Sequence, residues 1–190
     1  TRNLKIPYSA VGGRKEPRSE NNSLRRLHEF FSRIVKAAGE GADVSLMKIA
    51  KRLTMSNTNR PPVRVSAIAH QLGGSSKVAV VVAKVLDDER ILQLPAMRVV
   101  ALSWSRKAKA KIEANGGSIH TLDQFIRVAG SMDNIVLVKG DPTARKATKF
   151  FGPAPGEKNS TTYPRIIGKS KHKEKRLNVK KPVAYDSDSE

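Results

Sequence analysis

The sequence contains no cysteine among its 190 residues, which excludes disulfide bonds and thiolate metal sites and suits a reducing compartment. Aromatic residues make up only 5% of the chain and hydrophobic residues 38%, low values for a wholly compact domain. No apolar run approaches the roughly 20 residues that would span a bilayer, and the first residues lack the apolar centre of a secretory signal. We therefore expect a soluble intracellular protein, part of whose chain lies outside any core.

Motifs for catalysis are also missing. Residues 73–77 (Gly-Gly-Ser-Ser-Lys) have the composition of a phosphate-binding loop but not its spacing. There is no Gly-x-Ser-x-Gly elbow, and no pair of carboxylates is placed for acid–base catalysis. The carboxylates of Asp87, Asp88 and Glu89 are consecutive, but no second cluster of ligands accompanies them, so they do not predict a metal site. The sequence thus predicts no enzymatic activity, no cofactor, no metal and no small-molecule substrate.

Acidic residues are scarce, at 17 against 36 basic residues, and the formal net charge is +19. The excess is uneven: residues 1–76 carry +9, residues 77–138 only +3, residues 139–181 carry +10, and the last nine residues carry −3. A nearly neutral centre with strongly basic flanks is typical of a folded core with cationic arms that bind a polyanion. We expect such arms to become ordered only against phosphates.

Periodicity divides the chain into four segments. We predict a basic arm over residues 1–20, a helical region over 21–76, an α/β core over 77–152, and a basic tail with an acidic end over 153–190. Together they predict an α/β fold, a small layered domain of short strands and helices with basic arms at both ends. The expected helices span 21–38, 43–53 and 105–114, with shorter helices near 66–72, 122–129 and 143–149, and the expected strands span 78–85, 98–104 and 134–138.

Details of these elements can be tested individually. The β-branched run 78–85 is typical of a strand covered on both faces. The helix over 43–53 is predicted to pack through Val44 and Met47, with Ala50 as a further candidate. Ser66 and Thr121 are predicted as N-caps of short helices.

The most informative segment is Lys51–Pro62, in which a helix end leads through small polar residues to a stiff Pro-Pro pair. Arg60 precedes Pro61, and helical backbone angles are unfavourable for a residue before proline. Two cations at the helix end and a third on a stiffened loop would meet phosphates with little conformational entropy left to lose. A helix stop followed by a linker that is merely basic is the alternative interpretation.

This segment also carries a resemblance. Lys-Arg-Leu at 51–53, Met-Ser at 55–56 and Thr-Asn-Arg-Pro-Pro at 58–62 resemble the signature of the eukaryotic and archaeal large-subunit ribosomal protein eighteen, a relative of bacterial large-subunit protein fifteen. Supporting matches occur, in the same order, at 14–17 (Arg-Lys-Glu-Pro), 77–82 (Lys-Val-Ala-Val-Val-Val) and 151–156 (Phe-Gly-Pro-Ala-Pro-Gly). The resemblance covers about residues 14–176 and implies an irregular superhelix of repeated ββα units.

The resemblance implies a structural constituent of the large subunit that binds folded ribosomal RNA, with ribosomal RNA and neighbouring ribosomal proteins as partners and no membrane. It implies a cytoplasmic location on the ribosome, with passage through the nucleus and nucleolus during assembly. A freestanding regulatory RNA- or DNA-binding protein is the alternative, but no recognition helix, zinc spacing or aromatic-rich RNA-binding strand is present. The predicted RNA-binding residues are Arg14, Lys15, Lys51, Arg52, Asn57, Asn59, Arg60, Arg106, Lys107, Arg145, Lys149, Arg165, Lys169, Lys171, Lys173, Lys175 and Arg176.

Overall fold

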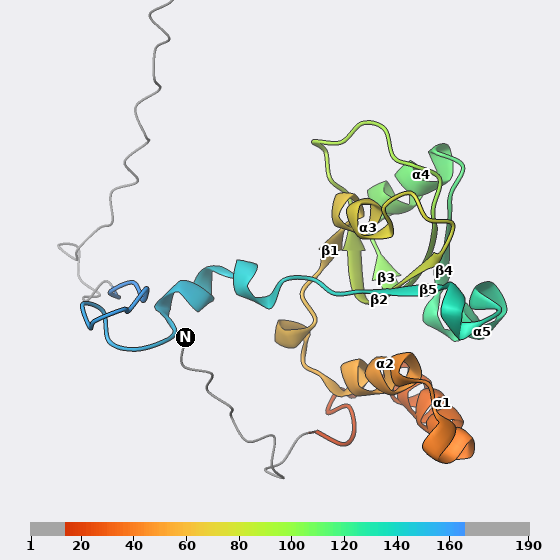
Figure 1. Cartoon of the computed structure of the whole chain (residues 1–190), viewed down its shortest axis with the longest axis horizontal. Coiled ribbons are helices and arrows are strands. Elements are labelled where there is room, and N and C mark those ends of the chain that lie inside the picture. Colours follow the sequence, from red (N-terminus) through yellow and green to blue (C-terminus); the bar gives the residue numbers. More distant parts are fainter. Residues whose placement is uncertain (1–13, 166–190) are drawn as a thin grey trace, which may run out of the picture. The chain divides into compact units, whose positions relative to one another are not determined.

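The computed structural model describes residues 14–165, which form two compact units, one ending at Pro142 and the other beginning at Thr143 (Figure 1). The first 13 residues of the predicted N-terminal arm and residues 166–190 of the predicted tail lie outside the described residues. The first unit contains helices and a parallel sheet, which confirms the predicted α/β class. Its elements are α1 (Asn22–Ala38), α2 (Val44–Thr54), β1 (Val63–Arg64), α3 (Val65–Leu72), β2 (Val78–Leu86), β3 (Arg98–Trp104), α4 (Arg106–Ala114), β4 (Ser118–Thr121), α5 (Phe125–Ala129) and β5 (Ile135–Val138).

All strand pairs in the sheet are parallel, and β2 lies at its centre. On one side β2 pairs with β3, which pairs with β4. On the other side β5 pairs with residues 78–81 of β2, and β1 pairs with residues 85–86. The strands β5 and β1 therefore share one edge of β2 end to end. A ββα order occurs as β2-β3-α4, and α3, α4 and α5 each connect a pair of strands.

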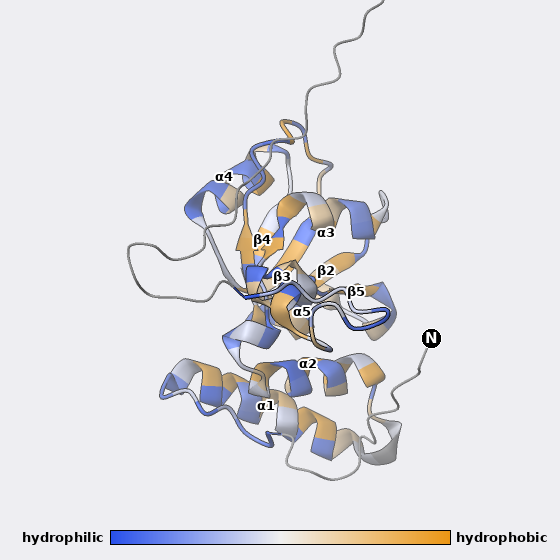
Figure 2. Cartoon of the chain, turned by 90° about the vertical axis from the view of Figure 1, so that its left-hand side faces the viewer, coloured by the Kyte–Doolittle hydropathy of each residue, from blue (hydrophilic) through white to orange (hydrophobic). Residues whose placement is uncertain are grey.

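Helices cover both faces of the sheet because successive residues of β2 point to opposite sides. Val78, Val80 and Val82 contribute to a core with α1, α2 and α5. Val81 and Val85 contribute to a second core with α3 and α4. Figure 2 shows the apolar strand residues between these two helical layers. The predicted boundary between residues 76 and 77 falls inside the first unit, because residues on both sides of it contribute to the same two cores.

Local capping fixes where most helices begin. The Oδ1 atom of Asn21 accepts hydrogen bonds from the backbone N of Ser23 at 2.9 Å and of Leu24 at 3.4 Å. Ser105 caps α4 as predicted, since its Oγ accepts from the N of Ala108 at 3.2 Å. The cap predicted at Ser66 is wrong, and Thr121 takes the N-cap position of a 3-10 turn without a capping hydrogen bond from its side chain. Helix α3 begins at Val65, which places Ser66 inside the helix, and a 3-10 turn at Leu122–Gln124 separates Thr121 from α5.

The packing of α2 predicted through Val44 and Met47 is also wrong, whereas Ala50 does pack against the core, partly buried. Val44 is 57% exposed and Met47 43%, whereas Leu46, Ile49 and Leu53 are buried. The stripe through residues 44 and 47 continues along the helix to Lys51, which is exposed. The stripe through 46, 49 and 53 is apolar throughout, so it forms the better face against α1 and β2.

The connection from β2 to β3 over residues 87–97 contains no helix and is held instead by a buried carboxylate. Asp88, 3% exposed, accepts from Ser66 Oγ at 2.7 Å and from Arg90 Nε at 3.0 Å. Lys111 Nζ of α4 lies 3.1 Å from Asp87 Oδ1 and donates to the carbonyl of Asp88 at 2.6 Å. These contacts tie α3 and α4 to the connection. The consecutive carboxylates therefore have a structural role on this face of the sheet.

Candidate nucleic-acid interface

The loop between α2 and β1 is well defined by its own backbone. After α2 ends, a 3-10 turn spans Asn57–Asn59, and the N of Arg60 donates to the carbonyls of Ser56 at 3.1 Å and Asn57 at 3.2 Å. Arg60 has φ −118° and ψ 64°, outside the helical region as predicted for a residue before proline. The loop is therefore fixed before it meets a ligand.

Close packing against the segment after β5 holds the Pro-Pro pair. A Cβ atom added at Gly140 would lie 2.8 Å from the carbonyl oxygen of Pro61 and 3.2 Å from that of Pro62. Only glycine allows this approach, so residue 140 fixes the position of the basic loop relative to the sheet.

Arg52, at the end of α2, is half-buried and has a structural partner. Its Nη1 donates to the carbonyl oxygen of Val138, the last residue of β5, at 3.1 Å. Removal from water lowers the pKa of Arg52 below its ordinary value. This arginine therefore links helix α2 to the sheet in addition to its predicted contact with RNA.

Arg60 is the most unusual cation of the loop. Its Nη2 donates to Asn57 Oδ1 at 3.2 Å. Its Nε and Nη1 atoms are buried and have no hydrogen-bond partner among the described residues. Burial lowers the pKa of the Arg60 guanidinium. A guanidinium with two buried, unpaired donors is poorly satisfied by this fold and well suited to an anion.

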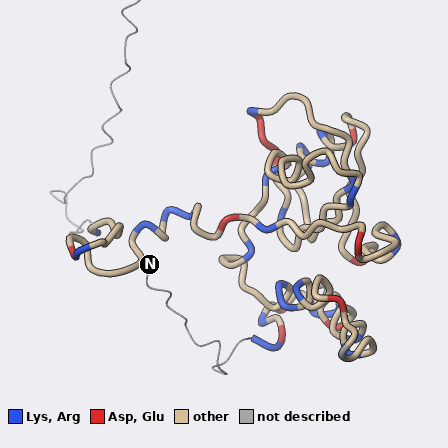
Figure 3. The backbone as a smooth tube through the Cα atoms, in the orientation of Figure 1, with Lys and Arg blue, Asp and Glu red and all other residues tan. Residues whose placement is uncertain are grey.

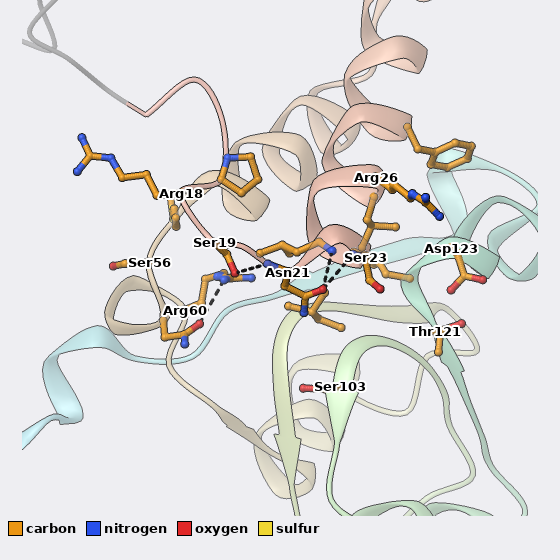
Figure 4. A pocket seen from close by; sticks show the side chains of 18 of the residues that line it. Arg18, Ser19, Asn21, Ser23, Arg26, Ser56, Arg60, Ser103, Thr121 and Asp123 are labelled. Carbon is orange, nitrogen blue, oxygen red and sulfur yellow. Dashed lines mark hydrogen bonds between the residues drawn. The ribbon is translucent and has the colours of Figure 1, made fainter.

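Arg60 lines a groove of about 750 Å³ on the α1–α2 side of the sheet, near the carboxyl ends of β3 and β4 (Figure 4). Three further arginines line the same groove: Arg14, Arg18 and Arg26. Among residues 14–165, none of the four forms an ion pair. Asp123 is the one carboxylate among the lining residues of this groove. The groove thus carries a strong positive potential.

The predicted residues fall into separate places on the first unit. Arg14, Asn57 and Arg60 line the groove together. Arg52, Asn59 and Arg60 line a smaller cavity of about 250 Å³ where β5 ends and β1 begins, and Lys15 lines a separate hollow beside α1. Lys51 is exposed at the end of α2.

Arg106 and Lys107 are not brought to the groove. They begin α4, which packs on the face of the sheet opposite α1 and α2. Lys107 Nζ lies 3.1 Å from Glu89 Oε1, so one of these two cations already has a carboxylate partner.

Sequence reasoning missed Arg18, Arg26 and the half-exposed Phe30, all of which line the groove. Figure 3 shows why charge alone could not locate it, since Lys and Arg are spread over much of the described chain. The helical period of α1 places Arg26 and Phe30 on one side of the helix, which was the available signal. This spacing points to a groove only once the structure places the loop before β1 and the ends of β3 and β4 beside α1.

The second unit brings cations and aromatic rings together. Lys149 Nζ lies 5.3 Å from the ring centroid of Phe150 and 5.4 Å from that of Tyr163. Arg165 lies over Phe150 at 5.9 Å, and Arg145 lies over Phe151 at 5.8 Å. Predicted residues Arg145, Lys149 and Arg165 are thus held by cation–π contacts on a short folded loop. Lys169, Lys171, Lys173, Lys175 and Arg176 lie outside the described residues.

Residues 14–165 contain neither a metal-binding cluster nor a membrane-spanning helix. In this range no three His, Asp or Glu side chains lie close enough to hold a metal ion. Within the same residues, no helix combines the length and the apolar character needed to span a bilayer.

Comparison with known proteins gives a consistent result. Residues 5–186 match the family described as ribosomal protein 60S L18 and 50S L18e. The chain is 32% identical over 181 residues to the large ribosomal subunit protein eL18 of Lysiphlebus testaceipes, covering 94% of this chain and 95% of the relative. It is 35% identical to the eL18 of Cicer arietinum (85% and 87% covered) and 39% identical to that of Aedes aegypti (80% and 75% covered).

Proposed function

The chain belongs to the family of ribosomal protein 60S L18 and 50S L18e, and from this premise we propose that it is a structural constituent of the large ribosomal subunit that binds folded ribosomal RNA through its basic loop and groove. The observation that carries the proposal is the convergence of Arg14, Arg18, Arg26 and Arg60 on one groove, where a single carboxylate opposes them.

Electrostatics supplies the mechanism. Each arginine that neutralises a phosphate releases condensed counterions, which favours binding at moderate salt. The guanidinium of Arg60 gains most, because its buried donors would acquire phosphate oxygens as acceptors. Contacts to the RNA backbone and to its shape dominate over base reading, since an A-form helix hides most base edges from side chains. The α/β unit positions these cations.

The remaining predicted contacts extend this surface. We assign Lys51, Arg52, Asn57 and Asn59 to the same RNA-binding side, since they flank or line the cavities around Arg60. In the second unit, Phe151 is 55% exposed and Tyr163 47% exposed, so cations and rings are both available to RNA. The basic residues of 169–176 add further phosphate contacts, each increasing the salt dependence of binding.

Ribosomal RNA and neighbouring ribosomal proteins are the partners, and the cytoplasmic ribosome is the place of action. We further propose that the short basic clusters near the carboxyl end support passage through the nucleus during assembly. We propose no catalytic role, because the described cavities contain cations without an acid–base pair.

Competition between tagged variants for incorporation into large subunits tests this function. Arg60→Glu is expected to reduce incorporation strongly, since it places a carboxylate where phosphate binds. Lys77→Glu is the matched control, because it makes the same charge change at an exposed residue beside the amino end of β2. Lys111 is unsuitable as a control, since its Nζ is paired with Asp87. Equal incorporation of both variants would contradict the role of the loop.

A further inference from the structure

The groove beside Arg60 differs from a surface that only binds phosphate, because it has an apolar side. Leu24, Leu27, Phe30 and Leu102 line it together with the four arginines. Phe30 is 40% exposed, and its ring packs edge-on against Phe31, with centroids 5.4 Å apart and planes at 81°. The buried ring of Phe31 therefore holds Phe30 in place and leaves the exposed part of Phe30 free for another planar group.

The polar lining residues lie at two ends of the groove. In Figure 4, Arg18, Arg60 and Ser56 lie together at one end, whereas Arg26, Thr121 and Asp123 lie at the other. Asp123 is exposed and forms no ion pair within residues 14–165. Its carboxylate can accept hydrogen bonds from an amino or ring N–H group of a base.

We propose that this groove receives a single unstacked nucleotide of the bound RNA, with its phosphate at Arg18 and Arg60 and its base against Phe30 near Asp123. The inference rests on the proposed RNA-binding function and names the form of RNA that the groove takes. A volume of about 750 Å³ lies within the roughly 300–1,000 Å³ of ligand pockets and exceeds what a phosphate alone needs. Proteins recognise RNA chiefly at loops and bulges, where bases can be splayed out onto aromatic side chains.

The exposed ring of Phe30, beside the arginines, favours RNA over a protein segment as the occupant. The lining has four arginines and one carboxylate, so an acidic peptide would also be attracted to it. An acidic peptide has flexible carboxylates and no planar ring to cover Phe30. A nucleotide carries a phosphate and a planar base on one sugar, so it offers one group to the arginines and another to Phe30.

The test measures binding of the full chain to two RNA hairpins with the same stem, one fully paired and one with a single unpaired nucleotide, placed as each of the four bases in turn. The bulged hairpin is expected to bind about tenfold more tightly, the size of one base–aromatic stacking contact. Phe30→Leu keeps an apolar group against Phe31 and is expected to abolish the preference while leaving affinity for the paired hairpin unchanged. Leu92→Ala, at an apolar residue 85% exposed in the connection between β2 and β3, is the control and is expected to keep the preference.

Each outcome separates this inference from the function on which it rests. If the wild-type chain binds both hairpins equally, or if Phe30→Leu keeps the preference, the nucleotide site is refuted while RNA binding stands. If neither hairpin binds, the proposed function itself fails. A second measurement places 2-aminopurine at the bulge: its fluorescence is expected to fall on binding to the wild-type chain and to fall less with Phe30→Leu. No difference between the two chains would also refute the site.

Discussion

Replacing Arg60 by methionine should strengthen the fold and weaken RNA binding at the same time. The Nε and Nη1 atoms of Arg60 are buried without partners among the described residues, and its Nη2 donates to Asn57 Oδ1 at 3.2 Å. Methionine keeps most of the apolar stem and removes the unpaired donors. If Arg60 instead stabilised its loop, the free energy of unfolding would fall.

The expected magnitude follows from this geometry. An unpaired buried donor costs about 1–3 kcal/mol, and a net hydrogen bond contributes about 0.5–1.5 kcal/mol. Removing two such donors, both on a half-buried side chain, and losing one bond to an exposed asparagine should raise the free energy of unfolding by about 1 kcal/mol. The melting temperature should rise by about 2–4 °C for a chain of this length. Urea denaturation of the RNA-free chain measures the free energy of unfolding, and thermal denaturation measures the melting temperature.

Binding to RNA should change in the other direction. Loss of one phosphate contact lowers the slope of log affinity against log salt by about 0.9. Arg52→Met provides the matched comparison, because Arg52 Nη1 donates to the Val138 carbonyl and its loss leaves that acceptor unpaired. It should lower the free energy of unfolding by about 1–3 kcal/mol. Destabilisation by Arg60→Met as large as that by Arg52→Met, or an unchanged salt slope, would refute the reasoning.

Three further predictions test the fold that supports the site. Gly140→Ala should destabilise the fold by about 1–3 kcal/mol, because its Cβ would lie 2.8 Å from the Pro61 carbonyl oxygen. Gly41→Ala is the control and should be nearly neutral in denaturation experiments, since open space surrounds that position. Leu53→Ala should lower the free energy of unfolding by about 2–5 kcal/mol and Met47→Ala by less than about 0.5 kcal/mol, since only Leu53 is buried. Equal losses of stability would instead support the packing through Met47 that the sequence predicted. Hydrogen bonds from Arg90 and Ser66 lower the pKa of Asp88 well below its usual range, so its contribution to stability is present above about pH 4 and declines as the pH falls below that value. Asp88→Asn should therefore show a smaller loss of stability between pH 5 and pH 2 than wild type in urea denaturation, and identical pH profiles would contradict this assignment.

The elements with strong local signals could be predicted from sequence nearly to the residue. Helix α1 was expected over 21–38 and spans Asn22–Ala38, and strand β3 was expected over 98–104 and spans Arg98–Trp104. An asparagine cap, a helical apolar stripe and a β-branched run are each contained within the segment they define. Whether these elements form therefore does not depend on distant residues.

The errors arose where two segments compete for one group. Ser66 has the chemistry of a cap, but the buried carboxylate of Asp88, 22 positions later, accepts its hydroxyl. The face of α2 depended on which apolar stripe α1 and β2 would cover. The groove depended on the 14–19 segment, α1, the loop before β1 and the sheet edge meeting at one place. No periodicity within a single segment carries that information.

The two faces of the sheet use charge in different ways, and this difference separates structural cations from those assigned to RNA. On the α3–α4 side, Arg90 and Lys111 have carboxylate partners in Asp88 and Asp87, within 3.1 Å. On the α1–α2 side, the groove arginines have no such partners among the described residues, and Arg60 is partly desolvated as well. Arg60 matters most, because a partly buried charge without a partner is unfavourable, whereas Arg14, Arg18 and Arg26 are exposed and cost little in the RNA-free protein. Among the described residues, the groove arginines lack the carboxylate partners that Arg90 and Lys111 have on the other face, and this difference is the physical reason to place the RNA at the groove.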